Sequence, residues 1–256
     1  MPSARALSLA LIAAIAYAAP RSAGAAADDV MLSTGDFPPY TSEKLPQGGI
    51  TSMIVREAFR AAGLPEPRIV FLPWKRGYSE TEAGHFAAGF PYARDAKREQ
   101  SFLYSEPLHL DKFSYFVRKD NAEAAAGQWQ GMRLCLPLGW TSAYTDADSQ
   151  AYRWKLERPA TLDNCWKMLE NGAVDLVSCN DFVAAYAIRQ LFGAQAPFAA
   201  AAIGKDQSSA LYLIISRKLP DGEALMRQFN AGLAEIKRNG RYRQLLQKAQ
   251  DASAAP

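Results

Sequence analysis

Residues 94–107, RDAKREQSFLYSEP, carry the side chains best suited to bind an anion. Arg94, Lys97 and Arg98 lie within five residues, and an aromatic run ending in Tyr104-Ser105 follows them. An arginine can offer a carboxylate two parallel N–H···O bonds from its planar guanidinium. The ordinary alternative is that all three cations are solvated charges on a helix surface. The stretch alone leaves both interpretations open.

Residue types that support metal binding or catalysis are scattered in this chain. His85 and His109 are its two histidines and lie far apart in the sequence, and its cysteines form no C-x-x-C pair. That distribution disfavours a metal site. The sequence also contains no nucleophile elbow and no phosphate-binding loop. We therefore predict a protein that is not an enzyme and needs no cofactor.

The first 27 residues have the pattern of an export signal, not of a folded element. Arg5 supplies a positive charge, residues 6–19 are apolar, and small residues typical of a cleavage site occur at 23–27. The apolar run is shorter than the about 20 residues that span a bilayer. We expect cleavage near Ala25 or Ala27 and a mature protein in the periplasm, a compartment that permits one disulfide among three cysteines.

The charge of the remaining chain excludes two classes of partner. Residues 1–27 contain Arg5 and Arg21 but no acid, so their removal leaves 27 cations and 26 anions. Nucleic-acid surfaces need clustered basic residues, and there is no polybasic tract for a lipid surface. The most apolar later segment, SALYLIIS at 209–216, has the length of a buried strand. We expect a monomer that binds neither nucleic acid nor membrane.

Hydrophobic periodicity and turn residues predict two successive blocks of alternating strands and helices. In the first block we expect strands at 30–33, 68–72 and 86–90 and helices at 50–63 and 73–83. In the second we expect strands at 131–137, 157–160 and 173–178 and helices at 143–154, 162–171 and 183–191. The chain ends with a strand at 209–216 and a helical tail over 221–248 that Gly240 interrupts. This order predicts an α/β fold of two lobes, each a mainly parallel sheet with flanking helices, and not one continuous sheet.

The chain should cross between the two lobes twice, near 108–116 and near 206–213. We place the first lobe at residues 28–111 and 208–256 and the second at 112–207. Ligands of open α/β sheets bind beyond the carboxyl ends of the strands. A cleft between two such lobes is therefore the expected site for a small ligand.

Six motifs between residues 30 and 250 resemble those of the family-3 periplasmic solute-binding proteins, which serve ABC importers, typically for polar amino acids. The motifs are GDFPPY with a following GG, LPWKRGYSETEAGHFAAGF, KREQSFLYSEP, GMRLCLPLGWTS, LENGAVDLVSCND and FNAGLAEIKRNGRYRQLLQKA. Each motif alone is weak, whereas six in the family's order and spacing behind an export signal are specific. The resemblance implies a two-lobed, hinged "flytrap" fold.

The resemblance assigns a carboxylate-binding role to residues of both lobes. Family members hold the α-carboxylate with an arginine seven residues before the serine of an aromatic-Ser pair, which is Arg98 relative to Ser105 here. The backbone N–H of Thr141 corresponds to a second contact with the carboxylate. Helix capping by Thr141 or Ser142 is the plainer interpretation of that loop.

Aromatic residues of the same motifs correspond to walls of the family's ligand site. Phe37 and Trp74 match positions that contact the ligand, and Tyr40 and Trp140 are neighbours of matched residues. Core packing is the commoner role of such side chains.

Departures from the family pattern bear on the identity of the ligand. Hydroxyl residues often precede the family's arginine, but Pro91 and Tyr92 occur here, and Pro91 cannot donate a backbone hydrogen bond. The family's ammonium-binding Asp corresponds to Asn180, with Asp181 next to it. Either Asp181 replaces it or the ligand is not a simple α-amino acid. Thr34 stands where binders of cationic amino acids have an acid, which disfavours lysine or arginine.

The resemblance also bears on the cysteines. The strand order usual in such lobes places the first strand between the second and the third, and a right-handed crossover then lays the helix of Cys165 over the strand of Cys135. We therefore favour a Cys135–Cys165 disulfide, with Cys179 free beside the cleft. Three buried thiols are the alternative.

The resemblance implies a periplasmic protein that captures an amino acid or other small carboxylate and delivers it to an inner-membrane ABC permease. One alternative is an enzyme on the same fold that resembles cyclohexadienyl dehydratases and needs an acid in the cleft, for which Asp181 is the candidate. A second alternative is a ligand-sensing partner of a membrane receptor.

Overall fold

The computed structural model describes residues 30–201, 203 and 207–254, so the expected export signal lies outside the described residues. The strands are β1 (Met31–Thr34), β2 (Arg68–Phe71), β3 (Ala88–Ala93), β4 (Phe102–Tyr104), β5 (His109–Arg118), β6 (Arg133–Cys135), β7 (Lys155–Glu157), β8 (Leu176–Asn180), β9 (Phe198–Ala200) and β10 (Gln207–Ser216). The helices are η1 (Pro46–Gly48), α1 (Ile50–Ala61), α2 (Trp74–Glu82), α3 (Ala96–Glu99), α4 (Ala122–Ala125), α5 (Asp146–Ala151), α6 (Leu162–Glu170), α7 (Asp181–Phe192), α8 (Gly222–Arg238) and α9 (Arg241–Ala254).

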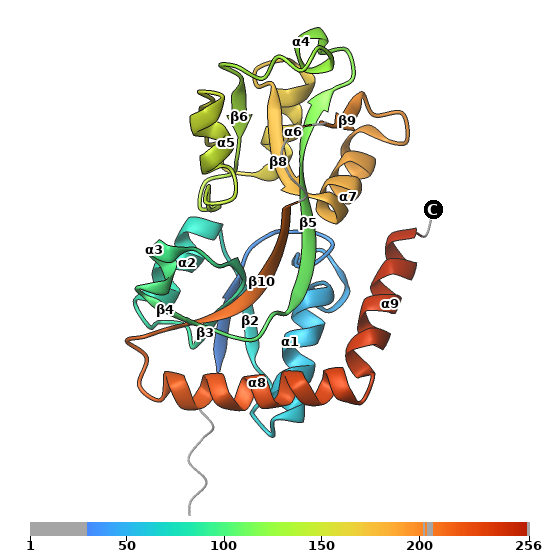
Figure 1. Ribbon diagram of the computed structural model, residues 1–256. Helices are drawn as coiled ribbons and strands as arrows, with labels where there is room; N and C mark the ends of the chain where they lie inside the picture. Colours follow the sequence, from blue (N-terminus) through green and yellow to red (C-terminus); the bar gives the residue numbers. More distant parts are fainter. Residues whose placement is uncertain (1–29, 202, 204–206, 255–256) are drawn as a thin grey trace, which may run out of the picture.

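The elements form two groups that β5 and β10 join (Figure 1). One group holds α1 to α3 together with α8 and α9, and the other holds α4 to α7. Within each group three strands run parallel with the first of them in the middle, in the order β2-β1-β3 and β7-β6-β8. The predicted α/β class and the predicted central position of each block's first strand are confirmed.

The prediction of two separate sheets is wrong. The strands described follow one hydrogen-bonded path, β2-β1-β3-β10-β5-β8-β6-β7, with β4 on β10 and β9 on β5. The reason is that β5 and β10 are each ten residues long and pair antiparallel with each other through Gln207–Leu211 and His109–Phe113. Since β10 also pairs with β3 and β5 also pairs with β8, the crossing strands connect the two parallel sets.

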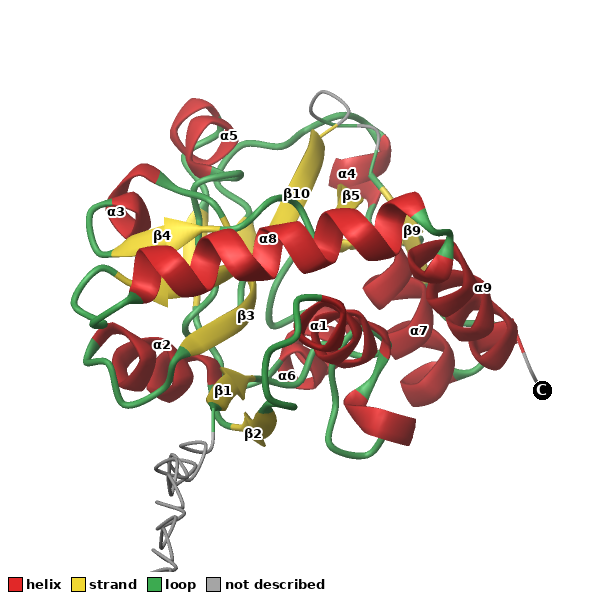
Figure 2. Ribbon diagram, turned by 90° about the horizontal axis from the view of Figure 1, so that it is seen from below, coloured by secondary structure: helices red, strands yellow, loops and turns green. Residues whose placement is uncertain are grey.

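Helices cover the sheet where their sequences carry an apolar stripe. In α1 the buried face includes Ile54, Ala58 and Phe59, and the ring of Phe59 lies 5.6 Å from that of Phe229 in α8. Figure 2 shows α8 passing across α1. A Cβ atom at Gly232 of α8 would lie 2.0 Å from the Ala58 carbonyl oxygen, so this close crossing of two helices requires glycine. Gly240, with φ of +83°, separates α8 from α9 as predicted.

The cysteine prediction is confirmed, because Cys135 of β6 and Cys165 of α6 form a disulfide. The third cysteine, Cys179, is a buried free thiol whose pKa burial raises. Within the described part of the chain, no helix has the length and apolar character needed to cross a membrane.

One element that differs from its predicted bounds is α5, which begins at Asp146 instead of residue 143. The preceding residues form a turn in which Thr141 Oγ1 accepts from the Ala143 N–H and Thr145 Oγ1 donates to the Ser142 carbonyl. Thr145, and neither Thr141 nor Ser142, is the residue before the helix. The residues between β6 and α5 therefore form a loop that extends to residue 145.

Candidate functional site

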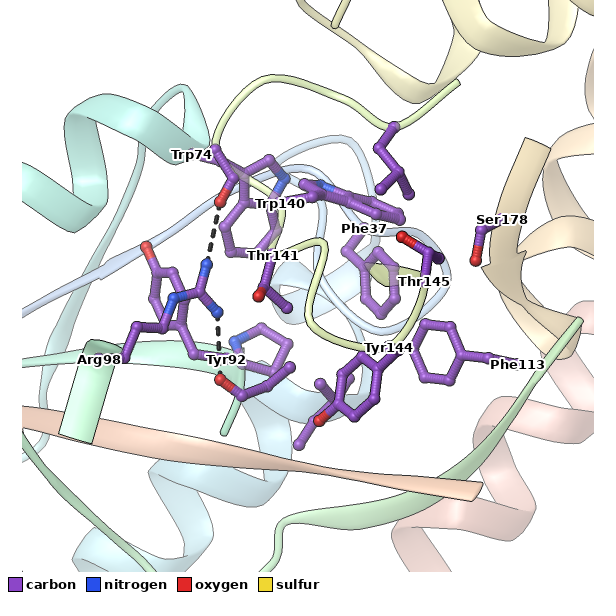
Figure 3. A pocket seen from close by; sticks show the side chains of 15 residues that line it. Phe37, Trp74, Tyr92, Arg98, Phe113, Trp140, Thr141, Tyr144, Thr145 and Ser178 are labelled. Carbon is purple, nitrogen blue, oxygen red and sulfur yellow. Dashed lines mark hydrogen bonds between the residues drawn. The ribbon is translucent and has the colours of Figure 1, made fainter. Parts of the chain in front are cut away.

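A cavity lies between the two groups of elements, and the empty space in and around it, open solvent included, is about 590 Å³. Figure 3 shows the side chains that line it. They are Phe37, Trp74, Pro91, Tyr92, Ala93, Arg98, Phe113, Leu136, Gly139, Trp140, Thr141, Tyr144, Thr145, Ser178 and Leu211. The set combines six aromatic rings with one charged side chain, that of Arg98.

Arg98 is held at the cavity by its own short helix. Asp95 caps α3, because its Oδ1 accepts from the Arg98 backbone N–H at 2.9 Å, and its Oδ2 lies 3.3 Å from Arg98 Nε. Arg98 is only 8 % exposed. The carboxylate of Asp95 thus holds the Arg98 backbone N–H and Nε in place and balances the positive charge of the guanidinium.

The guanidinium of Arg98 joins the two groups of elements. Nη1 donates to the Ala93 carbonyl at the end of β3, and Nη2 donates to the Gly139 carbonyl in the loop after β6, both at 3.1 Å (Figure 3). The guanidinium carbon lies 5.3 Å from the centre of the Tyr92 ring, in cation–π geometry. Each Nη carries two N–H groups, and the second of each has no partner among the described residues. The buried cation therefore keeps two donors for a ligand.

The loop after β6 closes the cavity from the second group. Gly139 has φ of +91°, and a Cβ atom there would lie 2.7 Å from Lys75 N and 2.9 Å from Trp74 Cβ. The N–H of Thr141 makes no hydrogen bond to any described residue. Arg158 donates to the Pro137 and Trp140 carbonyls at 3.3 and 2.6 Å and so fixes the loop from behind.

Two arginine side chains contact this loop, Arg98 and Arg158. Burial lowers the pKa of the Arg158 guanidinium, Asp146 opposes that shift, and the nearby charge of Arg98 adds to it. Two guanidinium groups thus donate to carbonyls of the residues just before the Thr141 N–H, Arg98 to Gly139 and Arg158 to Trp140. Such a segment favours an anion.

The aromatic walls come from both groups. Phe37 is 5 % exposed and lies edge-on to Trp140 at 5.3 Å and to Trp74 at 6.4 Å between ring centres. Trp74 donates from Nε1 to the Asp36 carbonyl at 3.0 Å, which fixes its ring. On the opposite side Phe113 of β5 stacks on Tyr144 at 5.9 Å. Aromatic rings thus bound the cavity on several sides.

Three predicted site residues lie elsewhere. Tyr40, Asn180 and Asp181 line a second hollow of about 680 Å³ of empty space, near Asp111 and Phe182. Tyr40 donates to Asp111 Oδ1 at 2.6 Å. Asn180 Oδ1 caps α7 by accepting from the Phe182 and Val183 N–H groups. The structure therefore brings together Arg98, Phe37, Trp74, Thr141, Tyr92 and Trp140, and it leaves these three residues outside that cavity.

The cavity residues absent from our sequence-based set include Leu136, Phe113 and Ser178. Leu136 directly follows β6, and Ser178 is the middle residue of β8. Position beyond the carboxyl end of a parallel strand is a signal that could have found Leu136. Phe113 lies on the crossing strand β5, whose register no motif indicates.

One buried cluster resembles a catalytic triad in composition alone. His109 Nδ1 lies 2.8 Å from Asp111 Oδ2 and its Nε2 lies 3.3 Å from Thr51 Oγ1, while the Tyr40 ring stacks on the imidazole at 4.2 Å. Thr51 has no exposed surface, so a substrate cannot reach its hydroxyl. The described residues also contain no group of three His, Cys, Asp or Glu side chains that could hold a metal ion.

Solved structures share this fold. At 17% identity the chain is similar to the ArtJ protein of Geobacillus stearothermophilus, described as arginine-, lysine- and histidine-binding (TM-score 0.73, covering 86% of this chain and 94% of that one). At 17% identity it is similar to the GluR0 ligand-binding core of Nostoc punctiforme, solved with L-glutamate (TM-score 0.70, 86% and 98%). It is also similar to a histidine kinase sensor domain (TM-score 0.72, 18% identity, 86% and 95%).

No curated protein sequence matches the chain. The family of bacterial extracellular solute-binding proteins, family 3, matches residues 30–251, which include every element described here except the last three residues of α9. By that match, this chain belongs to family 3 of the bacterial extracellular solute-binding proteins.

Proposed function

We propose that this protein captures a small ligand bearing a carboxylate, an amino acid or a related acid, in the cavity beside Arg98. The observation that carries the proposal is the position of the guanidinium. It is buried, it lines the cavity, it bonds to carbonyl groups of both groups of elements, and two of its N–H groups have no partner among the described residues. A hydrogen bond to a charged group contributes about 1.5–3 kcal/mol, and a carboxylate can accept two from one arginine.

Capture proceeds by closure of two lobes, residues 28–111 with 208–256 and residues 112–207, about the crossing strands. The ligand-binding residues are Arg98, Phe37, Trp74, Thr141, Tyr92 and Trp140. Support comes from the contacts of Gly139 with α2 and from its bond to Arg98, because both join the two groups of elements. Hinge movement about a few residues is a common mode of ligand closure.

A thermal-shift screen over amino acids, small carboxylates, polyamines and dipeptides tests the proposal. A ligand at about 100 times its Kd stabilises the folded state by about 2.7 kcal/mol. We expect the best ligand to carry a carboxylate and Arg98→Ala to abolish its shift. A best ligand without an anionic group, or full binding by Arg98→Ala, would contradict the proposal.

Arg94→Ala is the matched control. Arg94 lies four residues away, forms an ion pair with Glu99 at 3.3 Å and does not line the cavity. Its loss removes the same charge from the protein and should leave ligand affinity unchanged. Loss of binding in both variants would assign the effect to net charge instead of the site.

We further propose that the protein is exported to the periplasm after cleavage near residue 25 or 27 and delivers its ligand to an inner-membrane ABC permease. The family match and the similarity to ArtJ support this placement. Uptake of the labelled ligand by cells that lack the gene should fall and recover with the wild type but not with Arg98→Ala. Unchanged uptake with a lost transcriptional response to the ligand would favour a sensory partner, the use suggested by the kinase sensor domain of the same fold.

A further inference from the structure

The apolar and charged side chains that line the cavity limit the chemical class of ligand that it can bind. Its wall consists of aromatic rings from Phe37, Trp74, Phe113, Trp140 and Tyr144, with Leu136 and Leu211 among the remaining lining residues. Arg98 and Ser178 lie on opposite sides, with these rings between them (Figure 3). A ligand that places an anion at Arg98 must therefore lay the rest of its body against apolar rings.

No carboxylate lines the cavity among the described residues. Asp95, the acid at Arg98, already accepts from the Arg98 N–H and pairs with its Nε. Asn180 cannot take the role of an ammonium acceptor, because its Oδ1 is occupied by two N–H groups of α7. Asp181 lines the second hollow and not this cavity.

The polar oxygens that remain in the cavity are few. Thr141 Oγ1 accepts from the Ala143 N–H, Thr145 Oγ1 donates to the Ser142 carbonyl, and the carbonyl oxygens of Ala93 and Gly139 accept from Arg98. The Ser178 hydroxyl lies across the cavity from Arg98, away from an ammonium that would accompany a carboxylate bound there. The Tyr92 hydroxyl is buried behind the cavity near Gly77 and Ser33. An ammonium group buried here would lose its hydration without gaining a countercharge, which is strongly unfavourable. A carboxylate, by contrast, meets the free donors of Arg98 and the Thr141 N–H.

We propose that the ligand is an aromatic carboxylate that lacks an ammonium group, such as an arylalkanoate, and not an α-amino acid. This inference rests on the proposed function, because it assumes that the Arg98 cavity is the ligand site. Arg98 and the Thr141 N–H bind the carboxylate, and the aromatic body lies against Phe37, Trp140 and the stacked Phe113–Tyr144 pair.

Three probes of one skeleton test the inference by calorimetric titration of the wild-type protein. They are 3-phenylpropionate, L-phenylalanine and phenethylamine, which carry the carboxylate alone, both charges, and the ammonium alone. We expect 3-phenylpropionate to bind at least tenfold more tightly than L-phenylalanine and phenethylamine not to bind. L-Arginine and L-glutamate serve as polar amino acids and should bind more weakly than 3-phenylpropionate.

The outcomes separate the two proposals. Binding of any amino acid as tightly as 3-phenylpropionate, with loss of that binding in Arg98→Ala, overturns this inference and leaves the proposed function standing. If Arg98→Ala weakens the binding of none of these probes, and does not weaken that of the best ligand of the thermal-shift screen either, both this inference and the proposed function are wrong.

Discussion

The Asn180 side chain could bind a ligand or cap a helix, and in the structure it caps α7. Its Oδ1 accepts from the Phe182 and Val183 N–H groups, which are free donors at the start of α7. Asn180→Ala leaves them without partners in a buried place, and we expect a loss of about 1 kcal/mol in the free energy of unfolding. Because the side chain does not line the Arg98 cavity, ligand affinity should stay within twofold.

Denaturant unfolding and ligand titration of the same preparations measure the two effects at Asn180. Asn180→Asp is the matched variant, since Asp caps a helix as well as Asn does, and it should retain stability. A tenfold loss of affinity in Asn180→Ala, with wild-type stability, would restore the ligand role that the family resemblance implied.

Asp175 provides a residue-scale prediction that depends on pH. Burial alone would raise the pKa of its carboxyl, but the hydrogen bonds and charge of Arg133, with Arg133 Nη2 2.8 Å from Asp175 Oδ1, outweigh burial and lower that pKa. A lowered pKa contributes stability that is fully present above the unfolded pKa of about 3.9 and is lost as pH falls through the folded value. We expect Asp175→Asn to reduce the free energy of unfolding at pH 7. The difference from wild type should shrink below pH 4. Urea titrations at several pH values measure it, and a difference independent of pH would contradict it.

At the scale of elements, the disulfide joins β6 to α6 across a separation of 30 residues. A covalent loop of that length limits the unfolded chain and contributes about 3.5 kcal/mol in the chain-entropy treatment. We expect the double variant Cys135→Ala/Cys165→Ala to lose roughly 2–4 kcal/mol in the free energy of unfolding and to become insensitive to dithiothreitol. Urea unfolding with and without the reductant measures both effects.

Cys179→Ala is the control for that experiment, because Cys179 is buried but unbonded. It should keep the destabilisation that dithiothreitol causes in the wild type. Equal stability of the double variant and the wild type would show that the bond does not limit the unfolded state.

The sequence predicts most elements within a few residues, because Gly, Pro and apolar periodicity are local signals. The order of strands came from the resemblance to the family. Combined with a right-handed crossover, that order is why the Cys135–Cys165 pair could be predicted. The pairing of β5 with β10 could not, because residues 109–113 and 207–211 are far apart in the sequence and their register depends on tertiary packing. For the same reason Phe113 and Leu211 were not found as cavity residues. Asn180 matched a family position by the resemblance of its motif, yet its side chain caps α7.

At the scale of the whole molecule, the contact between Gly139 and the start of α2 determines whether the two groups of elements can approach. Gly139→Ala would place a Cβ atom 2.7 Å from Lys75 N and 2.9 Å from Trp74 Cβ, distances that backbone and side chain cannot accommodate without separation. We expect ligand affinity to fall at least tenfold. We also expect the radius of gyration, measured by small-angle X-ray scattering at saturating ligand, to remain at its ligand-free value.

Gly127→Ala separates this steric effect from backbone strain. Gly127 also has positive φ, +70°, but a Cβ atom there meets nothing within 4 Å. Both substitutions force alanine into a left-handed conformation at a cost of about 1–2 kcal/mol, so both should lower the melting temperature by similar amounts. Only Gly139→Ala should lose affinity and compaction, because only its new methyl group lies between the two groups of elements. If Gly139→Ala compacts with ligand as the wild type does, the cavity forms without close approach of the loop after β6 to α2, and the proposed closure is wrong.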